Sequence, residues 1–275
     1  MTLHLSEDDV VALLSPADAV EAIEACFRRM ANGSVENRPR YRLGLEEGTL
    51  AVMAASDLEL GVAGSKTYAA FSSGVAAKHL ARSGATTLGI IGCGRQADTQ
   101  VACIRAAVPT VERVVAYCRT AGSLQEFCAR TGAEPGESHR DPAAQEIVVT
   151  ATTSPDPVLR GEWLNPGALV CAIGANDGKR REVDNVVLER ATFVCCDSVE
   201  DARLESADLI EPVEAGVLDW LEVYELQDVV AGEIPGRESD DDIVVFKSNG
   251  LAAWDIAVGA VVLERARAAG RGTEL

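Results

Sequence analysis

The sequence contains few of the residues that build metal sites or nucleic-acid surfaces. Its three histidines stand far apart, at positions 4, 79 and 139, and its eight cysteines form no CxxC pair. This spacing argues against a zinc site and favours reduced, packed thiols over a disulfide framework. Only four lysines are present and the net charge is −18, whereas nucleic acid and anionic membranes attract clustered cations. We therefore expect no nucleic acid, no membrane and no metal as partners.

Long apolar runs are also missing. No stretch approaches the roughly 20 apolar residues that a membrane helix needs. The first nine residues carry three acids, Glu7, Asp8 and Asp9, where a signal peptide has a basic region. We expect a cytoplasmic protein. With 275 residues, 47% of them hydrophobic, the chain is long enough for two modest domains with buried cores.

Residues 1–85 predict a small α+β domain. Ser15 and Pro16 are typical of the cap and first position of a helix, and Gly33 is typical of its end. Two or three strands around a turn indicate an antiparallel sheet. The strands are expected over residues 38–45, 49–54 and 64–71, the turn at residues 46–48, and a further helix over residues 72–82.

Residues 86–250 repeat the order strand, turn and helix. Near-continuous apolar strands that alternate with helices predict an α/β fold, a doubly wound parallel sheet of the Rossmann type. A last helix over residues 251–268 follows this domain. The strands are expected over residues 88–91, 111–118, 146–152, 168–174, 192–196 and 243–246, and helices over residues 95–107 and 121–131.

Residues 92–97 (GCGRQA) follow the first of these strands directly. Gly92 permits a tight turn, and Gly94 lets a pyrophosphate approach the backbone. The helix that starts with Arg95 and Gln96 then directs free N–H groups at that anion. A lone GxG is an ordinary turn, but its position between a strand and a helix predicts dinucleotide binding.

The end of the next strand, residues 116–120 (AYCRT), indicates which dinucleotide binds. Enzymes that use NAD place Asp or Glu about 20 residues beyond the glycines, where it holds the ribose 2′-hydroxyl. This segment has no acid; Arg119 and Thr120 offer a cation and a hydroxyl to a 2′-phosphate. A solvated loop arginine is the alternative interpretation of Arg119. We expect NADP(H) to be favoured over NAD(H).

Several segments resemble the ornithine cyclodeaminase and mu-crystallin family. Residues 92–100 (GCGRQADTQ) match its GxGxQAxxQ element, and further matches follow in the family's order at residues 74–81, 172–176, 181–184 and 245–250, with Asp255. The resemblance implies a homodimer with a substrate and dimerisation domain at residues 1–85, completed by residues 251–275, and a dinucleotide-binding domain at residues 86–250. The remaining expected cofactor residues are Ala151, Thr152, Ile173, Gly174 and Ser248.

The resemblance also implies substrate-binding residues. In the family, an arginine thirteen residues before a strand methionine and a lysine thirteen residues after it hold the substrate carboxylate. Arg40, Met53 and Lys66 keep this spacing. Arg38, Arg40 and Arg42 alternate, so in an uninterrupted strand their side chains share one face. A solvated arginine stripe is the alternative for one or two of them.

Two departures from the family pattern bear on activity. Relatives carry several tens of residues, including a second carboxylate-binding arginine, between the lysine strand and the helix that matches residues 72–82; this segment is missing here, so we expect weak substrate binding. The second departure is Asn176. Cyclodeaminases place an aspartate there, and asparagine cannot accept a proton near neutral pH. Ketimine reductases such as mu-crystallin also lack that carboxylate and favour NADPH.

The leading hypothesis is an NADPH-dependent oxidoreductase of amino-acid metabolism that reduces the C=N bond of an imino acid. In this hypothesis Lys66 polarises the substrate or donates the proton, Arg40 clamps the carboxylate, and Asn176 orients the amine. The alternatives are an NAD-linked ornithine cyclodeaminase that forms proline and ammonia, an alanine-type amino-acid dehydrogenase, and a catalytically silent dinucleotide-binding protein.

Overall fold

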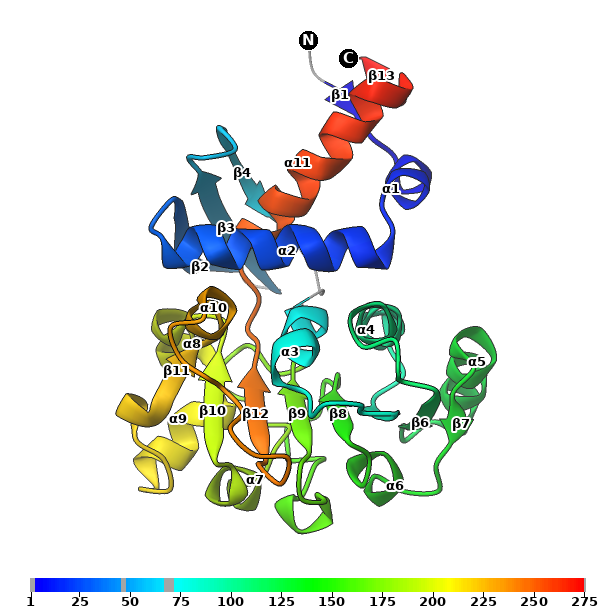
Figure 1. The fold of residues 1–275 in the computed structure, drawn as a ribbon, viewed down its shortest axis with the longest axis vertical. Coiled ribbons are helices and arrows are strands. Elements are labelled where there is room, and N and C mark those ends of the chain that lie inside the picture. The colour runs from blue at the N-terminus through cyan, green and yellow to red at the C-terminus, as the bar shows by residue number, and fades with distance from the viewer. Residues whose placement is uncertain (1–2, 46–47, 67–71, 275) are drawn as a thin grey trace. The chain divides into compact units, whose positions relative to one another are not determined.

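The structure is a computed structural model that describes residues 3–45, 48–66 and 72–274. The chain divides into two compact units: the first comprises residues 1–69 with 251–275, and the second comprises residues 70–250. Figure 1 shows the elements of both. The turn expected at Glu46 and Glu47, and the end of the strand expected at residues 67–71, lie outside the described residues.

The first unit contains a three-stranded antiparallel sheet in the order β2-β3-β4, as the sequence predicts. Its strands are β2 (Val35–Leu45), β3 (Gly48–Asp57) and β4 (Val62–Lys66). The long helices α2 (Pro16–Ala31) and α11 (Ala252–Ala269) pack against each other, and α11 covers the sheet. The C-terminal helix therefore completes the unit that begins with the N-terminus.

Local capping explains where α2 begins. The Ser15 hydroxyl accepts the Asp18 N–H at 3.2 Å, and the Asp18 carboxylate accepts the Ser15 N–H at 2.9 Å. This reciprocal capping satisfies two backbone donors that the first turn of a helix leaves open. Ser6 and Asp9 form the same arrangement at the start of α1 (Glu7–Leu13), a helix that the sequence analysis did not predict.

One face of the three-stranded sheet is buried and the other is exposed. Met53, Ala55 and Asp57 of β3 are buried, whereas Val52 and Ala54 between them are exposed. This alternation is that of a strand with one face packed on a core. The ends of the chain meet in the same unit, where β1 (Leu3–His4) pairs antiparallel with β13 (Thr273–Glu274).

The second unit is built on an eight-stranded parallel sheet in the order β11-β10-β12-β9-β8-β5-β6-β7 (Figure 1). The order reverses at β5, which pairs with β6 on one side and β8 on the other. This reversal is the switch point at which doubly wound sheets bind ligands. The strands are β5 (Thr87–Ile91), β6 (Arg113–Tyr117), β7 (Glu134–Pro135), β8 (Ile147–Thr150), β9 (Leu169–Ala172), β10 (Phe193–Cys196), β11 (Val223–Glu225) and β12 (Val244–Lys247).

Helices cover both faces of this sheet. The sequence analysis placed residues 72–82 in the first domain, but α3 (Ser72–Leu80) packs against β9 and β12 and thus belongs to the second unit. The other helices are α4 (Arg95–Ala107), α5 (Ala121–Thr131), α6 (Arg140–Ala143), α7 (Asn185–Arg190), α8 (Val199–Glu205), α9 (Ala207–Glu214) and α10 (Leu226–Ala231), with 3₁₀ turns at Gly161–Trp163 and Trp220–Glu222.

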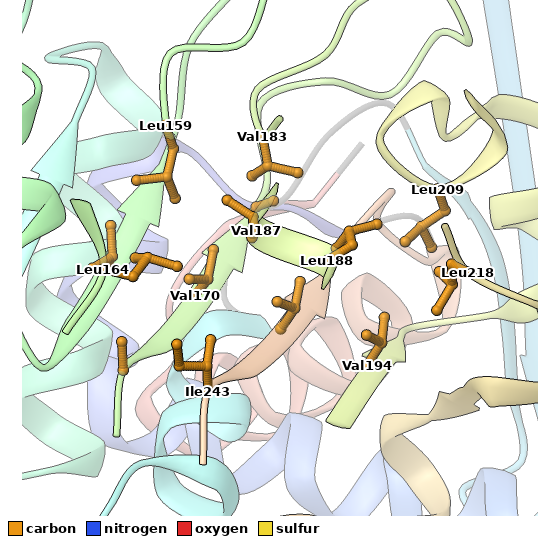
Figure 2. Close-up of a cluster of buried hydrophobic side chains, with 14 of the residues drawn as sticks. Leu159, Leu164, Val170, Val183, Val187, Leu188, Val194, Leu209, Leu218 and Ile243 are labelled. Carbon is orange, nitrogen blue, oxygen red and sulfur yellow. The ribbon is translucent and has the colours of Figure 1, made fainter. Parts of the chain in front are cut away.

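A row of valines crosses the sheet and anchors the core of the second unit. Val148, Val170, Val245 and Val194 are register partners on four neighbouring strands, and all are buried. Figure 2 shows Val170 and Val194 in one cluster with side chains of α7. Each such valine contributes about 1.5 to 3 kcal/mol relative to an exposed position. The row fixes the strand ends that carry the loops described next.

Candidate cofactor and substrate sites

The turn after β5 requires glycine. Gly92 has φ of +109°, and a Cβ added there would lie 2.3 Å from the carbonyl oxygen of Ala151. Backbone hydrogen bonds join the three strand ends around it: Gly92 N–H donates to Tyr117 O at 2.9 Å, and Ala151 N–H donates to Ile91 O at 2.8 Å. A side chain at position 92 would therefore push apart the ends of β5 and β8.

Gly94 has a different role, because space is free around it. It caps α4 with an extended backbone and no side-chain hydrogen bond, and an added Cβ would meet nothing within 4 Å. The N–H groups of Arg95 and Gln96, the first residues of α4, lie behind this open position. Asp98 in the same turn would repel an anion, but the guanidinium of Arg130 lies 3.1 Å from its carboxylate. An uncapped helix start behind a glycine turn fits the pyrophosphate of a dinucleotide.

The end of β6 carries the two residues expected to select the cofactor. Arg119 and Thr120 directly follow the strand and are both exposed. Thr120 is the N-cap of α5, and its hydroxyl makes no capping hydrogen bond. A cation, a hydroxyl and a helix start thus stand together at the strand end beside the glycine turn.

Glu182, to which the sequence analysis assigned no role, clamps the loops after β8 and β9. Its Oε1 accepts the N–H and the hydroxyl of Thr152 at 2.6 and 2.8 Å. Its Oε2 accepts the Thr150 hydroxyl at 2.9 Å and the Gly174 N–H at 2.5 Å. Gly174 packs so closely on Thr152 that an added Cβ would lie 2.3 Å from its carbonyl oxygen. The clamp positions four expected cofactor residues, Ala151, Thr152, Ile173 and Gly174.

A buried lysine lies at the end of the neighbouring strand. Lys247, the last residue of β12, is fully buried, and its Nζ lies 3.2 Å from Asp208 Oδ2. The other oxygen of Asp208 accepts the N–H groups of Glu182 and Val183 at 2.7 and 3.1 Å. Burial raises the pKa of the Glu182 carboxyl, while the Lys247 ammonium acts in the opposite direction. The four donors around Glu182 keep it ionised at neutral pH.

Ser248 lies at the same edge of the sheet but is nearly buried. Its hydroxyl donates to Asp197 Oδ2 at 3.0 Å, and the N–H groups of Asn249 and Gly250 donate to that oxygen at 2.7 and 2.6 Å. Burial raises the pKa of Asp197, and these donors lower it. Ser248 therefore shapes the end of β12 through Asp197.

Asn176 and Asp177 follow β9 in the loop that the clamp begins. Asn176 is half-buried. The Asp177 carboxylate accepts the Arg180 Nε–H at 2.7 Å and the Lys179 N–H at 3.1 Å. These donors outweigh the effect of burial and hold the pKa of Asp177 below its usual value. Asp177 is thus engaged within its own loop and does not take the place of an aspartate at position 176.

Arg40, Met53 and Lys66 form a row across the three-stranded sheet. Lys66 is the register partner of Met53, and the Arg40 Nε donates to the Met53 sulfur at 3.3 Å. The shared face expected for three alternating arginines is wrong, because a bulge shifts the register between Arg38 and Tyr41. Arg38 is exposed and pairs with an exposed glutamate, while Arg40 turns to the buried methionine.

The predicted residues thus fall into two groups. The expected cofactor residues gather at the carboxyl edge of the parallel sheet in the second unit, together with Asn176. The expected carboxylate-binding residues gather in the sheet of the first unit. The eight cysteines are free thiols, and five of them are buried. Within the described ranges, no helix has both the length and the apolar character to cross a membrane.

Comparison with known proteins places this architecture. Residues 66–270 match the ornithine cyclodeaminase/mu-crystallin family. An alanine dehydrogenase of Archaeoglobus fulgidus is 30% identical, in an alignment that covers all of this chain and 98% of the relative. That alignment has 320 positions, 45 more than the 275 residues of this chain, so the relative carries several tens of residues without a counterpart.

Two pyrroline-carboxylate reductases are also similar. A Δ1-pyrroline-2-carboxylate reductase of Bacillus cereus is 36% identical over 74% of this chain and 64% of its own length. The structure of the Thermococcus litoralis enzyme of that name, in complex with NADH and L-proline, matches the whole of both chains with a TM-score of 0.93 and 27% identity. The matches over most of the sequence and the shared fold show that this chain belongs to the ornithine cyclodeaminase/mu-crystallin family.

Proposed function

We propose that this chain is a nicotinamide-dependent reductase of an imino acid, which it converts to the corresponding amino acid. The observation that carries the proposal is the open N-terminus of α4 behind Gly92 and Gly94, at the switch point of the parallel sheet. That position accepts a dinucleotide pyrophosphate. The family and the similarity to pyrroline-carboxylate reductases support a C=N bond beside a carboxylate as the reacting group.

The cofactor supplies the hydride when it is bound; the chain supplies its binding and orientation. The N–H groups of Arg95 and Gln96 hold the pyrophosphate, and the loops clamped by Glu182 support the nicotinamide half. We assign the 2′-phosphate of NADPH to Arg119 and Thr120, which are exposed at the end of β6, so NADPH is preferred to NADH.

The row in the three-stranded sheet provides the substrate-binding groups. We assign the carboxylate of the imino acid to the guanidinium of Arg40 and the ammonium of Lys66, and the proton that the product nitrogen gains to Lys66. Asn176 orients that nitrogen by hydrogen bonding, since an amide neither takes nor gives a proton near neutral pH. We assign a homodimer to the functional form, with assembly through the first unit.

One other activity has a specific observation in its favour. The alanine dehydrogenase of Archaeoglobus fulgidus aligns over the full length of this chain, so reductive amination of a 2-oxo acid is the second candidate. It differs from imine reduction in needing free ammonia as a substrate. Ornithine cyclodeamination is disfavoured because Asn176 replaces the aspartate that the reaction needs and Asp177 is engaged by Arg180.

The experiment is a substrate screen with both reduced cofactors. Cyclic imino acids such as pyrroline-2-carboxylate, and pyruvate with and without ammonium, are each mixed with NADPH or NADH, and the loss of absorbance is followed. Oxidation of cofactor by cyclic imino acids without ammonium supports imine reduction; oxidation only with pyruvate and ammonium supports the dehydrogenase. Tight cofactor binding without turnover of any substrate supports a silent binding protein, and the absence of cofactor binding defeats the proposal.

A further inference from the structure

Three buried carboxylates share one buried lysine beneath the loops that follow β8, β9 and β12. Glu182, Asp197, Asp208 and Lys247 are all 1% exposed or less. Lys247 contacts Asp208 directly, and its positive charge also acts on the carboxyl groups of Glu182 and Asp197. Buried charges are normally balanced, because an excess of one sign is costly in a medium of low dielectric constant. This group carries more acid than base.

The hydrogen bonds fix the charge state of the group. A neutral carboxyl must donate one proton to an acceptor. The partners of Glu182 are two hydroxyls and two N–H groups, and Asp197 accepts one hydroxyl and three N–H groups. The N–H groups and hydroxyls that surround Glu182 and Asp197 satisfy them as anions. With Asp208 paired to Lys247, two negative charges remain in excess.

These charges lie under one half of the proposed cofactor site, and the inference rests on the proposed function. The sheet order reverses between β5 and β8, and each half of such a sheet holds one nucleotide of the dinucleotide. The glycine turn and the end of β6 belong to the adenosine half. The nicotinamide half falls on β8, β9 and β12, where Glu182 accepts the N–H groups of Thr152 and Gly174.

We infer that Glu182 sets the preference of this site for the oxidised over the reduced cofactor. The oxidised nicotinamide ring carries a positive charge that the reduced ring lacks. A buried anion below the ring stabilises the oxidised form, and water screens it little. The clamp also positions the loops, but positioning serves both forms alike. The charge of Glu182 is therefore visible in the ratio of the two affinities, whereas its structural role cancels in that ratio.

The test is the ratio of dissociation constants for the two redox forms. Calorimetry with NADPH and NADP⁺, and with NADH and NAD⁺, gives this ratio for the parent chain and for Glu182→Gln. Both forms bind more weakly to the variant, because a glutamine amide cannot accept the donors that face it. In addition, the ratio shifts toward the reduced form by about fourfold to twentyfold, as expected for one charge at about 10 Å and an effective dielectric constant of about 20 to 40.

Two matched variants isolate the charge. Asp156→Asn removes an exposed carboxylate from the loop after β8 and leaves the ratio unchanged, because water screens that position. The double variant Asp208→Asn with Lys247→Met removes one charge of each sign and preserves the net charge of the group, so its ratio stays near that of the parent. Should Glu182→Gln fail to fold, as judged by circular dichroism, Asp197→Asn removes an excess charge from the same group and shifts the ratio in the same direction.

The outcomes separate this inference from the function on which it rests. A parent chain that binds neither redox form of either cofactor overturns the proposed function. A parent chain that binds both forms, with a ratio that stays within twofold in the folded Glu182 or Asp197 variant, overturns only the inference. A shift of the ratio toward the reduced form in that variant, absent in Asp156→Asn, supports it.

Discussion

Replacing Gly94 with alanine is expected to separate cofactor binding from folding. Gly94 has φ of −84° and ψ of 176°, a conformation open to any residue, and an added Cβ meets no atom within 4 Å. The fold should therefore tolerate the methyl group. Alanine is a poorer helix cap than glycine, which costs about 0.5 to 1 kcal/mol and lowers the Tm by about 1 to 3 °C.

The loss should appear in cofactor affinity. The methyl group occupies the open position in front of the N–H groups of Arg95 and Gln96, where the pyrophosphate must approach. Each hydrogen bond to a charged group that is lost costs about 1.5 to 3 kcal/mol. Loss of one such bond raises the Kd of the cofactor by about tenfold to 150-fold.

Two other glycine variants provide the controls. Gly132 ends α5 at φ of +71° with nothing near its Cβ position, so Gly132→Ala costs about 1 to 2 kcal/mol of stability and leaves the Kd unchanged. Gly92→Ala combines a positive φ with a Cβ at 2.3 Å from Ala151 O, so it should lose both stability and cofactor affinity. Thermal melts and calorimetry with both reduced cofactors measure the two effects. A folded Gly94→Ala variant that binds within twofold of the parent would refute the assignment of the pyrophosphate to this turn.

Four further outcomes are expected. NADPH should bind the parent several-fold more tightly than NADH, and Arg119→Ala should remove most of that difference; tighter NADH binding by calorimetry contradicts the assignment. Lys66→Met should lower kcat/KM about thirtyfold to several-thousand-fold, as for the loss of a charged partner, with NADPH affinity within about twofold; unchanged turnover rules out the role. Ornithine with NAD⁺ should yield little proline because of Asn176, and steady formation at about 1 per second would favour a cyclodeaminase. Burial raises the pKa of Glu146, but hydrogen bonds from Thr86, Arg82 and Thr87 outweigh it and bring it from 4.5 to about 2. Its carboxylate stabilises the fold fully above about pH 4.5, and on the order of 2 to 3 kcal/mol is lost as the pH falls toward 2; Glu146→Gln should flatten the unfolding free energy across that window, and an unchanged pH profile refutes it.

Local patterns predicted most of the helices and strands. The helices beginning at Arg95 and Ala121 start and end where the sequence analysis placed them, because each follows a strand directly and meets a clear stop. The strand expected over residues 111–118 is shorter in the structure, Arg113–Tyr117. The apolar run continues beyond the residues that pair with β5, since burial and backbone pairing do not end at the same residue.

The weakest local signals were missed. Helix α1 is seven residues long and has no buried residue, so no apolar periodicity marks it; only its capping residues, Ser6 and Asp9, are visible in the sequence. The bulge between Arg38 and Tyr41 was also missed, and it changed the environment of Arg40. A bulge depends on how two strands pair, and that pairing is not encoded in the alternation of one strand.

The sequence alone determined the glycine turn and its position between a strand and a helix, because these depend on neighbouring residues. The buried group of Glu182, Asp208 and Lys247 depended on tertiary structure. These residues are separated by 26 and 39 positions along the chain and meet only because the parallel sheet brings the ends of β8, β9 and β12 to one edge. In the sequence each reads as an ordinary polar residue beside an apolar run. Burial makes their charges strong, and burial is a property of the folded sheet.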